Sequence, residues 1–517
     1  MTTAAVSLVE TAVRAGVDIC FANPGTTELP IVAAFDHVPG IRVVLGLFEG
    51  VCTGAADGWA RMTGRPAATL LHLGPGLANG LANLHNARRA RSPVVNWVGD
   101  HARHHLAFDG PPTSDIAALA GTVGWTRTVT SSQEAAEASL AAVQAALGPP
   151  GRVASLIIPA DCQWGAGPAV PPVTPAPALH DVVSSAVEEA ARLLRGGGCG
   201  LFLGGNALTE RGLRAAGRVS AATGCEAWIE TWPARQEGGR HLPSVSLLPH
   251  FPKPARRALG NVRTLVLAGA REPVSSPADP DQPSRLLPDD ASVHTLADPD
   301  TGVDAAQALE AVAQALNAPA VRVVAPDTTA FVPTGQPLDP ASLGRALAAF
   351  TPEGAIVVNE AATTGLAWTA TYAATAAPHT VLGLTGDGMG QGLPTALGAA
   401  LACPDRRVLA YQADGCGLHT LQALWSMARE SADITVVVCA NRRYRTLQSE
   451  LAQLTSRPGP TALSLTDLTR PAINWADLAR GFGVPACSVY TDTEILVAFA
   501  RALAERGPSL IEAVLPG

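Results

Sequence analysis

Short apolar runs rich in β-branched residues alternate with longer Ala- and Leu-rich segments along most of this 517-residue chain. Runs with the length and composition of buried strands occur at 94–98, 263–268, 355–358, 407–411 and 434–438. Segments with the spacing of amphipathic helices occur at 184–194, 341–349 and 421–428. Apolar strands that alternate with helices are typical of a parallel sheet covered on both faces. The alternation therefore predicts an α/β protein built from doubly wound parallel sheets.

Two Pro-rich stretches interrupt this alternation. The first covers 165–177, and the second covers 319–340 and includes Pro326. Proline fixes φ and removes a backbone donor, so neither stretch is expected to form a helix or an inner strand. The chain is therefore expected to form three domains of ordinary size, at 1–165, 178–318 and 338–517.

Charge and cysteine usage argue against several classes of protein. The formal net charge is -8, and the Arg-rich runs at 88–91 and 442–445 are too short to make the basic stripe of a nucleic-acid-binding surface. The nine cysteines are scattered, with no Cys-x-x-Cys pair and no spacing typical of a zinc site. Neither a signal peptide nor an apolar run of roughly 18 residues is present in the sequence. We therefore expect a cytoplasmic protein whose partners include neither nucleic acid nor a membrane.

Two polar residues follow neighbouring apolar runs in the last third of the chain. Asp414 follows the run at 407–411, and Asn441 follows the run at 434–438, 27 residues later. If the two strands are neighbours in a parallel sheet, a carboxylate and an amide oxygen meet at the same edge. Mg²⁺ takes such oxygens together with those of phosphate and water. An isolated Asp-Gly after a strand is ordinarily a turn, so the pairing with Asn441 is what favours a binding site.

The residues around this pair, Ala413-Asp414-Gly415-Cys416 and Ala440-Asn441, resemble the Gly-Asp-Gly and Asn-Asn signature of thiamine-diphosphate-dependent enzymes. The resemblance extends over nearly the whole chain, and it is strongest to benzoylformate decarboxylase and to the large subunit of acetohydroxyacid synthase. It implies a pyrimidine-binding first domain, a Rossmann-like middle domain, and a third domain that binds the diphosphate and Mg²⁺.

The same resemblance implies a set of metal ligands. Asp414, the Asn441 side chain and the backbone carbonyl of Arg443 would hold Mg²⁺. Ala413 and Ala440 depart from the signature, where they replace its first glycine and its first asparagine. Neither departure removes an implied ligand.

Diphosphate contacts are implied at Gly415 and Cys416. Cys416 stands where a serine commonly helps to bind the diphosphate. Backbone amides, and the hydroxyl of Thr363 or Thr364, are therefore expected to take over that hydrogen bond. A helix that begins near Leu418 would favour the anion at its N-terminus.

Glu49 lies between Phe48 and Gly50, after a short apolar run at 42–45. A glutamate in such a place is ordinarily a surface charge at the end of a strand. In the resembled family this residue activates the cofactor, because it shares a proton with the pyrimidine ring and so allows the ring's imine form to remove the thiazolium C2 proton. The resemblance therefore implies that Glu49 is both a catalytic and a cofactor-binding residue.

A glycine-rich segment at 386–394 would, on its own, be interpreted as an ordinary flexible loop. By the resemblance, Met389 is the apolar residue that supports the bent cofactor, and its unbranched thioether suits the space beneath two rings. The backbone carbonyl of Asp387 would accept a hydrogen bond from the 4'-amino group. A glycine is common at that position, so the aspartate is unusual.

Substrate contacts are expected from both ends of the chain. The segment 21–30 resembles a loop of benzoylformate decarboxylase, with Thr26 in place of its substrate-binding serine, and His72 matches that enzyme's active-site histidine. Both are expected to be catalytic, since a hydroxyl can bind a carboxylate and an imidazole can relay protons near neutral pH.

Further candidates for substrate contacts are Leu447 and a cluster of histidines. Leu447 stands where pyruvate decarboxylase has a glutamate. A histidine cluster either supplies replacement acid-base groups or forms a solvated turn; it consists of His101, His104 and His105.

These assignments predict an enzyme that uses thiamine diphosphate and Mg²⁺ to decarboxylate a small 2-oxo acid. The acyl-anion equivalent is then released or ligated to an aldehyde or a second oxo acid. Two alternatives stay open: a carboligase of the acetolactate synthase type proper, and a degenerate family member that binds ligand without catalysis.

Two further cofactors are disfavoured by the middle part of the sequence. FAD is not expected, because 235–241 lacks the flavin contacts of acetohydroxyacid synthases. A nicotinamide-dependent oxidoreductase is also disfavoured, because the glycines at 204–205 fail the full dinucleotide fingerprint. Since Glu49 and Asp414 lie in different domains, we expect a homodimer or homotetramer with active sites at the subunit interface.

Overall fold

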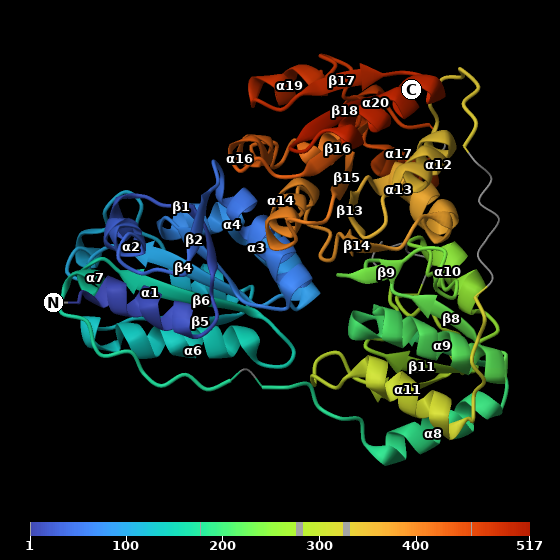
Figure 1. Cartoon of the computed structure of the whole chain (residues 1–517), viewed down its shortest axis with the longest axis horizontal. Coiled ribbons are helices and arrows are strands. Elements are labelled where there is room, and N and C mark those ends of the chain that lie inside the picture. Colours follow the sequence, from blue (N-terminus) through green and yellow to red (C-terminus); the bar gives the residue numbers. More distant parts are fainter. Residues whose placement is uncertain (1, 176, 276–282, 324–330, 456, 517) are drawn as a thin grey trace.

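The computed structural model of the protein describes residues 2–175, 177–275, 283–323, 331–455 and 457–516. Its strands form sheets of six, five and seven strands, each accompanied by helices, and Figure 1 shows them as three lobes. All the strand pairs within these sheets are parallel except the pair that adds the last edge strand of the third sheet. The expected α/β class with doubly wound parallel sheets is therefore confirmed. Pro326 lies outside the described residues.

The first sheet has the order β2-β1-β3-β4-β6-β5. Its strands are β1 (Ile19–Asn23), β2 (Arg42–Leu45), β3 (Ala67–Leu71), β4 (Val94–Asp100), β5 (Trp125–Thr128) and β6 (Val153–Pro159). Every residue of β3, β4 and β6 is buried, because helices cover both faces. One face packs against α1 (Ala4–Arg14), α2 (Leu29–Phe35) and α6 (Ala135–Leu147). The other packs against α3 (Glu49–Thr63), α4 (Leu73–Ala90) and α5 (Ile116–Gly121).

The middle sheet has the order β10-β8-β7-β11-β12. Its strands are β7 (Cys199–Leu203), β8 (Glu226–Ile229), β10 (Ser246–Leu247), β11 (Thr264–Ala268) and β12 (Ser292–Ala297). Its helices are α8 (Ser184–Arg195), α9 (Glu210–Thr223), α10 (Pro252–Leu259) and α11 (Ala305–Ala315).

The third sheet has the order β17-β18-β16-β15-β13-β14-β9. Six strands come from the last third of the chain: β13 (Ala355–Glu360), β14 (His379–Gly383), β15 (Val408–Ala413), β16 (Ile434–Ala440), β17 (Ala486–Val489) and β18 (Ser509–Val514). Its main helices are α12 (Pro340–Phe350), α13 (Ala362–Ala367), α14 (Gly392–Ala402), α16 (Ala423–Arg429), α19 (Trp475–Gly481) and α20 (Asp492–Ala504).

The seventh strand of this sheet comes from the middle of the chain. β9 (Gln236–Gly238) lies within the segment 178–318, yet it pairs antiparallel with β14, with Gln236 opposite Val381. Three residues are too few to give a periodic signal, so the sequence does not indicate this strand.

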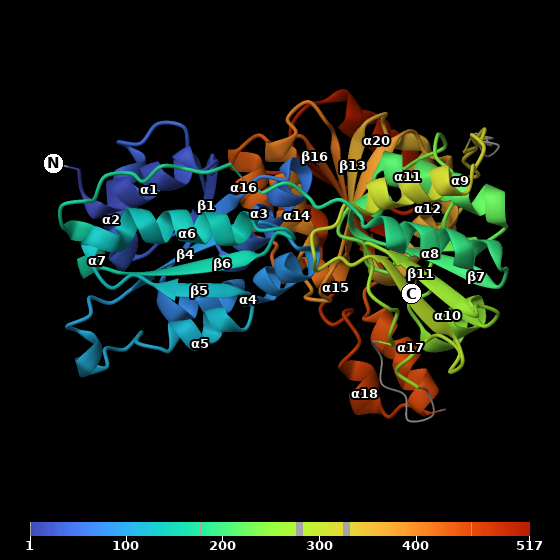
Figure 2. The ribbon, with the colours of Figure 1, turned by 90° about the horizontal axis from the view of Figure 1, so that it is seen from below.

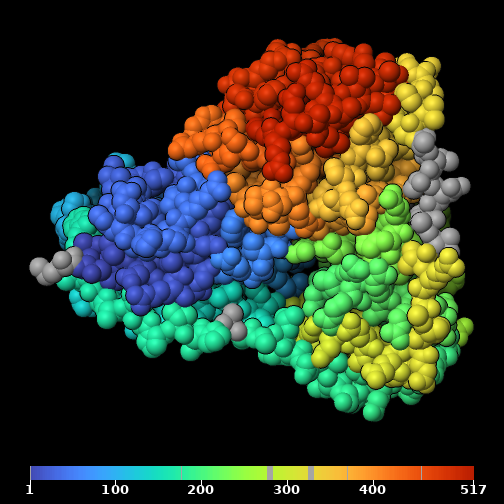
Figure 3. Space-filling model, in the orientation of Figure 1, coloured from blue at the N-terminus to red at the C-terminus, as the bar shows by residue number. Residues whose placement is uncertain are grey.

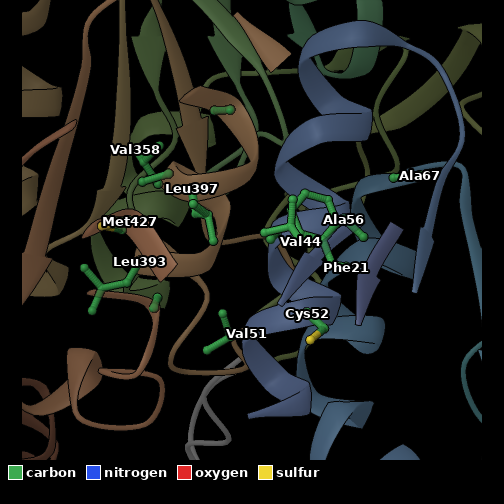
Figure 4. Packing of buried hydrophobic residues seen from close by; sticks show 14 of the residues in the cluster. Phe21, Val44, Val51, Cys52, Ala56, Ala67, Val358, Leu393, Leu397 and Met427 are labelled. Carbon is green, nitrogen blue, oxygen red and sulfur yellow. The ribbon is translucent and has the colours of Figure 1, made fainter. Parts of the chain in front are cut away.

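One hydrophobic cluster joins the first and third sheets. It extends from Phe21 and Val44 through Val51 of α3 to Leu393 of α14 and Met427 of α16. Figure 4 shows these side chains along the contact between the two domains. α3 and α14 pack closely, since a Cβ on Gly58 or Gly398 would meet the backbone of the other helix at 2.2 and 1.9 Å. The two domains therefore share a core.

A cavity of about 1180 Å³ lies between the first and middle domains, where Figure 3 shows a hollow between the blue and green lobes. The Arg-rich run 88–91 lines it on one side, and Gly205, Glu230 and Arg271 line it on the other. None of the residues expected to bind the cofactor lines this cavity. In the described part of the chain, no helix is both long and apolar enough to cross a membrane.

Candidate functional site

The strands that precede Asp414 and Asn441 are neighbours, as the sequence predicts. β15 and β16 pair in parallel, with Ala413 opposite Cys439, and the two polar residues lie just beyond the ends of these strands. Asp414 Oδ2 accepts a hydrogen bond of 2.6 Å from the backbone amide of Arg442. The two side chains are therefore brought to one edge of the third sheet.

The chemistry of this pair fits a divalent cation. Asp414 is only 2% exposed and takes part in no salt bridge within the described residues. Burial raises the pKa of Asp414, although the amides of Arg442 and Gly415 oppose the rise. Asn441 Oδ1 accepts a 3.0 Å hydrogen bond from the Arg443 amide, which folds the segment after β16 back beside Asp414. A buried carboxylate without a cationic partner, next to an amide oxygen, suits Mg²⁺ with oxygen ligands.

Protein carboxylates alone would not complete such a coordination shell. The described ranges contain no group of three or more His, Cys, Asp or Glu residues that could hold a metal ion. The remaining ligands would have to be backbone carbonyls, such as that of Arg443, water, and the oxygens of a bound diphosphate.

Cys416 and Met389 are in contact. Cys416 lies in the short helix α15 (Asp414–Gly417), and its thiol donates to the Met389 sulfur at 3.3 Å. Burial raises the pKa of Cys416 well above its ordinary value, and the carboxylates of Glu360 and Asp414 add to the rise. The thiol therefore stays protonated, and the partly exposed Met389 side chain rests beside it.

The threonines expected at the diphosphate follow β13, which is the neighbour of β15. Thr363 and Thr364 lie in the first turn of α13, where Thr364 is buried and Thr363 is half-buried. They thus occupy the same edge of the sheet as Asp414.

Glu360, the last residue of β13, was not singled out by its sequence. It is buried, and its carboxylate accepts hydrogen bonds from the amides of Gly390, Gln391 and Gly392 at 2.7, 3.1 and 2.8 Å, and from the Gln412 side chain at 2.9 Å. An acceptor is expected at the start of a helix, where the first amides lack partners. Glu360 therefore fixes the start of α14 and the loop that contains Met389.

Asp387 has φ of 60°, in the left-handed region. This conformation explains why a glycine is common at the position, since glycine adopts it without strain. Leu73, Ala362 and Arg442 also have positive φ, and each lies two residues beyond the end of a strand of the first or third sheet. Strained non-glycine residues of this kind cost about 1–3 kcal/mol each and gather at functional sites.

A row of asparagines on α4 connects Glu49 to the Met389 loop. Asn79 Nδ2 donates to Glu49 Oε2 at 3.0 Å. Asn83 Nδ2 donates to the carbonyls of Gly50, at 2.8 Å, and Gly390, at 3.3 Å. One turn further on, Asn86 bonds both the carbonyl and the amide of Gly388, at 2.8 and 3.1 Å. Residues at such spacings lie on one face of a helix, so α4 presents a continuous row of amides.

This row brings the first and third domains together within one chain. The separation of Glu49 and Asp414 in the sequence therefore does not by itself require a second subunit. The expectation that the active site lies at a subunit interface stays a prediction.

Thr26 and His72 come from neighbouring strands of the first sheet. Thr26 is exposed at the start of η1 (Thr26–Glu28), just beyond β1, and His72 directly follows β3. A Cβ on Gly76 would lie 3.0 Å from Glu49 Oε1 and 3.6 Å from the His72 Cβ, so these two side chains flank the same glycine. His72 Nδ1 lies 2.9 Å from Glu28 Oε2, a contact that the sequence did not suggest.

The histidine cluster lies after β4, the strand beside β3. His101 is half-buried, whereas His104 and His105 are exposed and stack edge to face with ring centroids 4.5 Å apart. Arg103, which precedes His104, donates a hydrogen bond to Asp161 and so anchors the turn. No hydrogen bond in the described structure connects this cluster to His72 or Glu49.

Leu447 lies on α17 (Arg445–Leu454) and is 52% exposed. Figure 2 shows α17 projecting from the body of the molecule together with α18 (Pro460–Ser464).

Two protein-family models match the chain. Residues 2–120 match the N-terminal TPP binding domain of thiamine pyrophosphate enzymes, and residues 361–513 match the C-terminal TPP binding domain. The first range contains Glu49 and His72, and the second contains Met389 and Asp414.

Similar proteins cover almost the whole chain. It is 46% identical to IlvX, a candidate acetolactate synthase large subunit of Mycobacterium tuberculosis, over 99% of this chain and 98% of that protein. It is 29% identical to the benzoylformate decarboxylase of Pseudomonas aeruginosa, over 96% of each. Among solved structures, the thiamine diphosphate-dependent 4-hydroxybenzoylformate decarboxylase of Rhodococcus jostii RHA1 is similar with a TM-score of 0.84 and 26% identity, over 99% of both chains.

Proposed function

Because this chain belongs to the thiamine pyrophosphate enzyme family, we propose that it decarboxylates a 2-oxo acid and releases the acyl-anion equivalent or ligates it to a second carbonyl compound. The observation that carries this proposal is the pair of hydrogen bonds from Asn83 to Gly50 and Gly390, since it joins the Glu49 segment to the Met389 loop. A cofactor seated over that loop would have a carboxyl group of the first domain as its neighbour.

Thiamine diphosphate, when bound, supplies a carbon nucleophile and an electron sink for the loss of carbon dioxide. Asp414, Asn441 and the Arg443 carbonyl would hold Mg²⁺ at its diphosphate. The amides of Gly415 and Cys416 and the hydroxyls of Thr363 and Thr364 would donate to the phosphate oxygens.

The pyrimidine end would be held by residues of both domains. Glu49 would keep a proton shared with the ring nitrogen, and Asn79 orients the carboxyl group through its 3.0 Å hydrogen bond. The Asp387 carbonyl would accept from the amino group, and Met389 would support the bent conformation. Preorganised groups of this kind stabilise developing charge without reorganising during the reaction.

Thr26 and His72 would contact the 2-oxo acid. The exposed hydroxyl of Thr26 can donate to a carboxylate, and the His72 imidazole, which flanks Gly76 with Glu49, can hold or release a proton. We propose more distant contacts to the substrate or to the acceptor for the remaining candidates, which are His101, His104, His105 and Leu447.

Ligation of the acetolactate synthase type is the second candidate, and the 46% identity to IlvX favours it. The third is a degenerate protein that binds ligand without catalysis, which Ala413, Ala440 and Cys416 would motivate. Asp414 is buried and forms no salt bridge in the described part of the chain, and this observation and the Asn79 contact to Glu49 argue for a working site.

We further propose three domains, at 1–165, 178–318 and 338–517, that bind the pyrimidine, form the middle lobe and bind the diphosphate with Mg²⁺, respectively. We propose a homodimer or homotetramer, in which a partner subunit covers the edge of the site. A cytoplasmic location is proposed because all nine cysteines are free.

The test is a panel of 2-oxo acids, with and without aldehyde acceptors, given to the chain reconstituted with thiamine diphosphate and Mg²⁺. Carbon dioxide release and product mass separate decarboxylation from ligation. The matched control is Glu49→Gln, which is expected to bind the cofactor but to lose at least about 100-fold in turnover. Near-normal turnover by this variant, or no release of carbon dioxide from any acid by the wild type, would contradict the proposal.

A further inference from the structure

We propose that Glu28 is a positioning residue that keeps a proton on Nδ1 of His72 and leaves Nε2 as the basic nitrogen. This inference rests on the proposed function for its catalytic consequence. Its structural basis, the contact between Glu28 and the imidazole, is independent of that function.

The Glu28 carboxylate is completely buried and has three donors around it. Oε2 accepts from the Gly25 amide at 2.7 Å, and Oε1 accepts from the hydroxyl of Thr27. His72 Nδ1 is the third, at 2.9 Å from Oε2, and Glu28 forms no ion pair with a Lys or Arg within the described residues. A buried carboxylate needs such donors to offset the loss of water.

The surroundings of Nδ1 decide which nitrogen of the ring is protonated. Its two neighbours are Glu28 Oε2 and, at 3.3 Å, Thr27 Oγ1. Thr27 has one hydroxyl proton, and that proton is directed to Glu28. Both neighbours of Nδ1 are therefore acceptors, so Nδ1 must be the donor.

The backbone around this pair leaves space for both side chains. A Cβ on Gly99 would lie 1.6 Å from Glu28 Oε1, and a Cβ on Gly25 would lie 2.2 Å from His72 Nδ1. Any larger residue at either position would displace the carboxylate or the ring. The two glycines thus leave space for a contact between side chains from two neighbouring strands.

Other ionisable groups lie near His72 without bonding it. Glu49 approaches from α3 across Gly76, and its carboxylate is engaged by Asn79. Asp100 and His101 lie at the end of β4, next to Gly99, and Asp100 accepts from the His101 amide. Nε2 has no hydrogen-bond partner in the described structure, and the side chain is 33% exposed. This nitrogen is therefore free for a substrate.

A proton fixed on Nδ1 makes Nε2 the nitrogen of His72 that can exchange a proton with the substrate. Nε2 can accept a proton or a hydrogen bond, and once protonated it can return the proton to the reacting carbon or oxygen. Without the carboxylate, the ring can adopt the other tautomer, and the protonated form loses its counter-charge. Loss of the carboxylate partner of a metal-bound histidine costs about 10- to 100-fold in activity, and we expect an effect of similar size at His72.

The test is long-range ¹H–¹⁵N spectroscopy of the histidines in the full chain, with His72 assigned by its absence in His72→Asn. The wild type is expected to show a protonated Nδ1 and an unprotonated Nε2 at neutral pH. In Glu28→Gln we expect the second tautomer or a mixture, and kcat reduced at least about tenfold with cofactor binding unchanged. Glu10→Gln, the same change at the glutamate that pairs with Arg14 on α1, is expected to leave both properties unchanged.

An Nε2-protonated His72 in the wild type would overturn the proposal without any variant, so a Glu28→Gln chain that fails to fold does not remove the test. A folded Glu28→Gln with the wild-type tautomer would also overturn it. If no 2-oxo acid is decarboxylated, the proposed function fails, while the tautomer measurement still decides the role of Glu28.

Discussion

Asn83 of the first domain donates its side-chain amide to the Gly390 carbonyl of the third domain, 3.3 Å away. The same amide donates to Gly50, so one buried side chain sets the distance between the Glu49 segment and the Met389 loop. Asn83 therefore contacts both halves of the candidate site directly, although it belongs to neither segment.

Asn83→Asp is expected to weaken both the fold and the site. The change replaces a donating NH₂ with an oxygen that faces two carbonyls, and each lost buried hydrogen bond costs about 1–3 kcal/mol. We expect a lower Tm and at least about tenfold weaker binding of thiamine diphosphate, measured by calorimetry and fluorescence titration. Asn261→Asp, at an exposed turn, provides the control. Wild-type cofactor affinity in Asn83→Asp would show that the bridge does not position the loop.

Asp414→Asn is expected to abolish the dependence of cofactor binding on Mg²⁺. The amide keeps the shape but removes the negative charge that a divalent cation requires. The affinity for thiamine diphosphate is measured by titration, once with Mg²⁺ and once with a chelator. The two affinities should differ by a large factor in the wild type and by little in the variant. Asp405→Asn, in the exposed turn before β15, should behave as the wild type. A variant that still needs Mg²⁺ would move the metal away from Asp414.

Glu230 predicts a pH dependence of stability. Burial raises its pKa to about 7, against the opposing effects of Arg91, the Gly205 amide and Arg89. The folded chain therefore binds more protons than the unfolded chain between pH 4.5 and about 7. The stabilising contribution is complete below the ordinary value of 4.5 and is lost as the pH rises through about 7.

Unfolding in urea between pH 4 and 8 tests this dependence. The free energy of unfolding of the wild type, relative to Glu230→Gln, is expected to fall by roughly 1–3 kcal/mol as the pH rises. Glu226→Gln, at the exposed start of β8, should show no such change relative to the wild type. A difference that is constant with pH would contradict the raised pKa.

Arg61 is expected to be among the most sensitive residues for stability. It forms a buried salt bridge with Asp57 and donates to the carbonyls of Gly383 and Ala234, so it links all three domains. Arg61→Met leaves Asp57 buried without its cation, which typically costs about 3–5 kcal/mol. Thermal unfolding should show a large fall in Tm, whereas Arg14→Ala, which removes an exposed ion pair, should change it little. A similar, small shift in both variants would mean that Asp57 is satisfied by Ser92 and Gln391 alone.

The sequence predicts the strands and the closeness of Asp414 to Asn441 because both follow from local rules. Apolar runs mark β13, β15 and β16, and a parallel crossover necessarily brings Asp414 and Asn441 to one edge. The family resemblance adds Glu49 and Met389, which composition alone would leave as a surface charge and part of a loop.

The supporting residues could not be found in the same way. Asn79, Asn83 and Asn86 have the spacing of an ordinary polar helix face, and only the packing against residues 386–390 reveals their role. Glu360 ends a strand and Glu28 ends the short helix η1. A solvated charge is the usual outcome for a glutamate in such places. Their partners lie up to 52 residues away, so no periodic pattern connects them.

The common core of α3 and α14 limits how a ligand can enter. Rotating the first domain away from the third would expose Val51, Leu393 and their neighbours to water, at about 25 cal/mol for each Å² of apolar surface. Rigid separation of the first and third domains is therefore disfavoured as a route into the site. A ligand should accordingly enter and leave while α3 and α14 stay in contact.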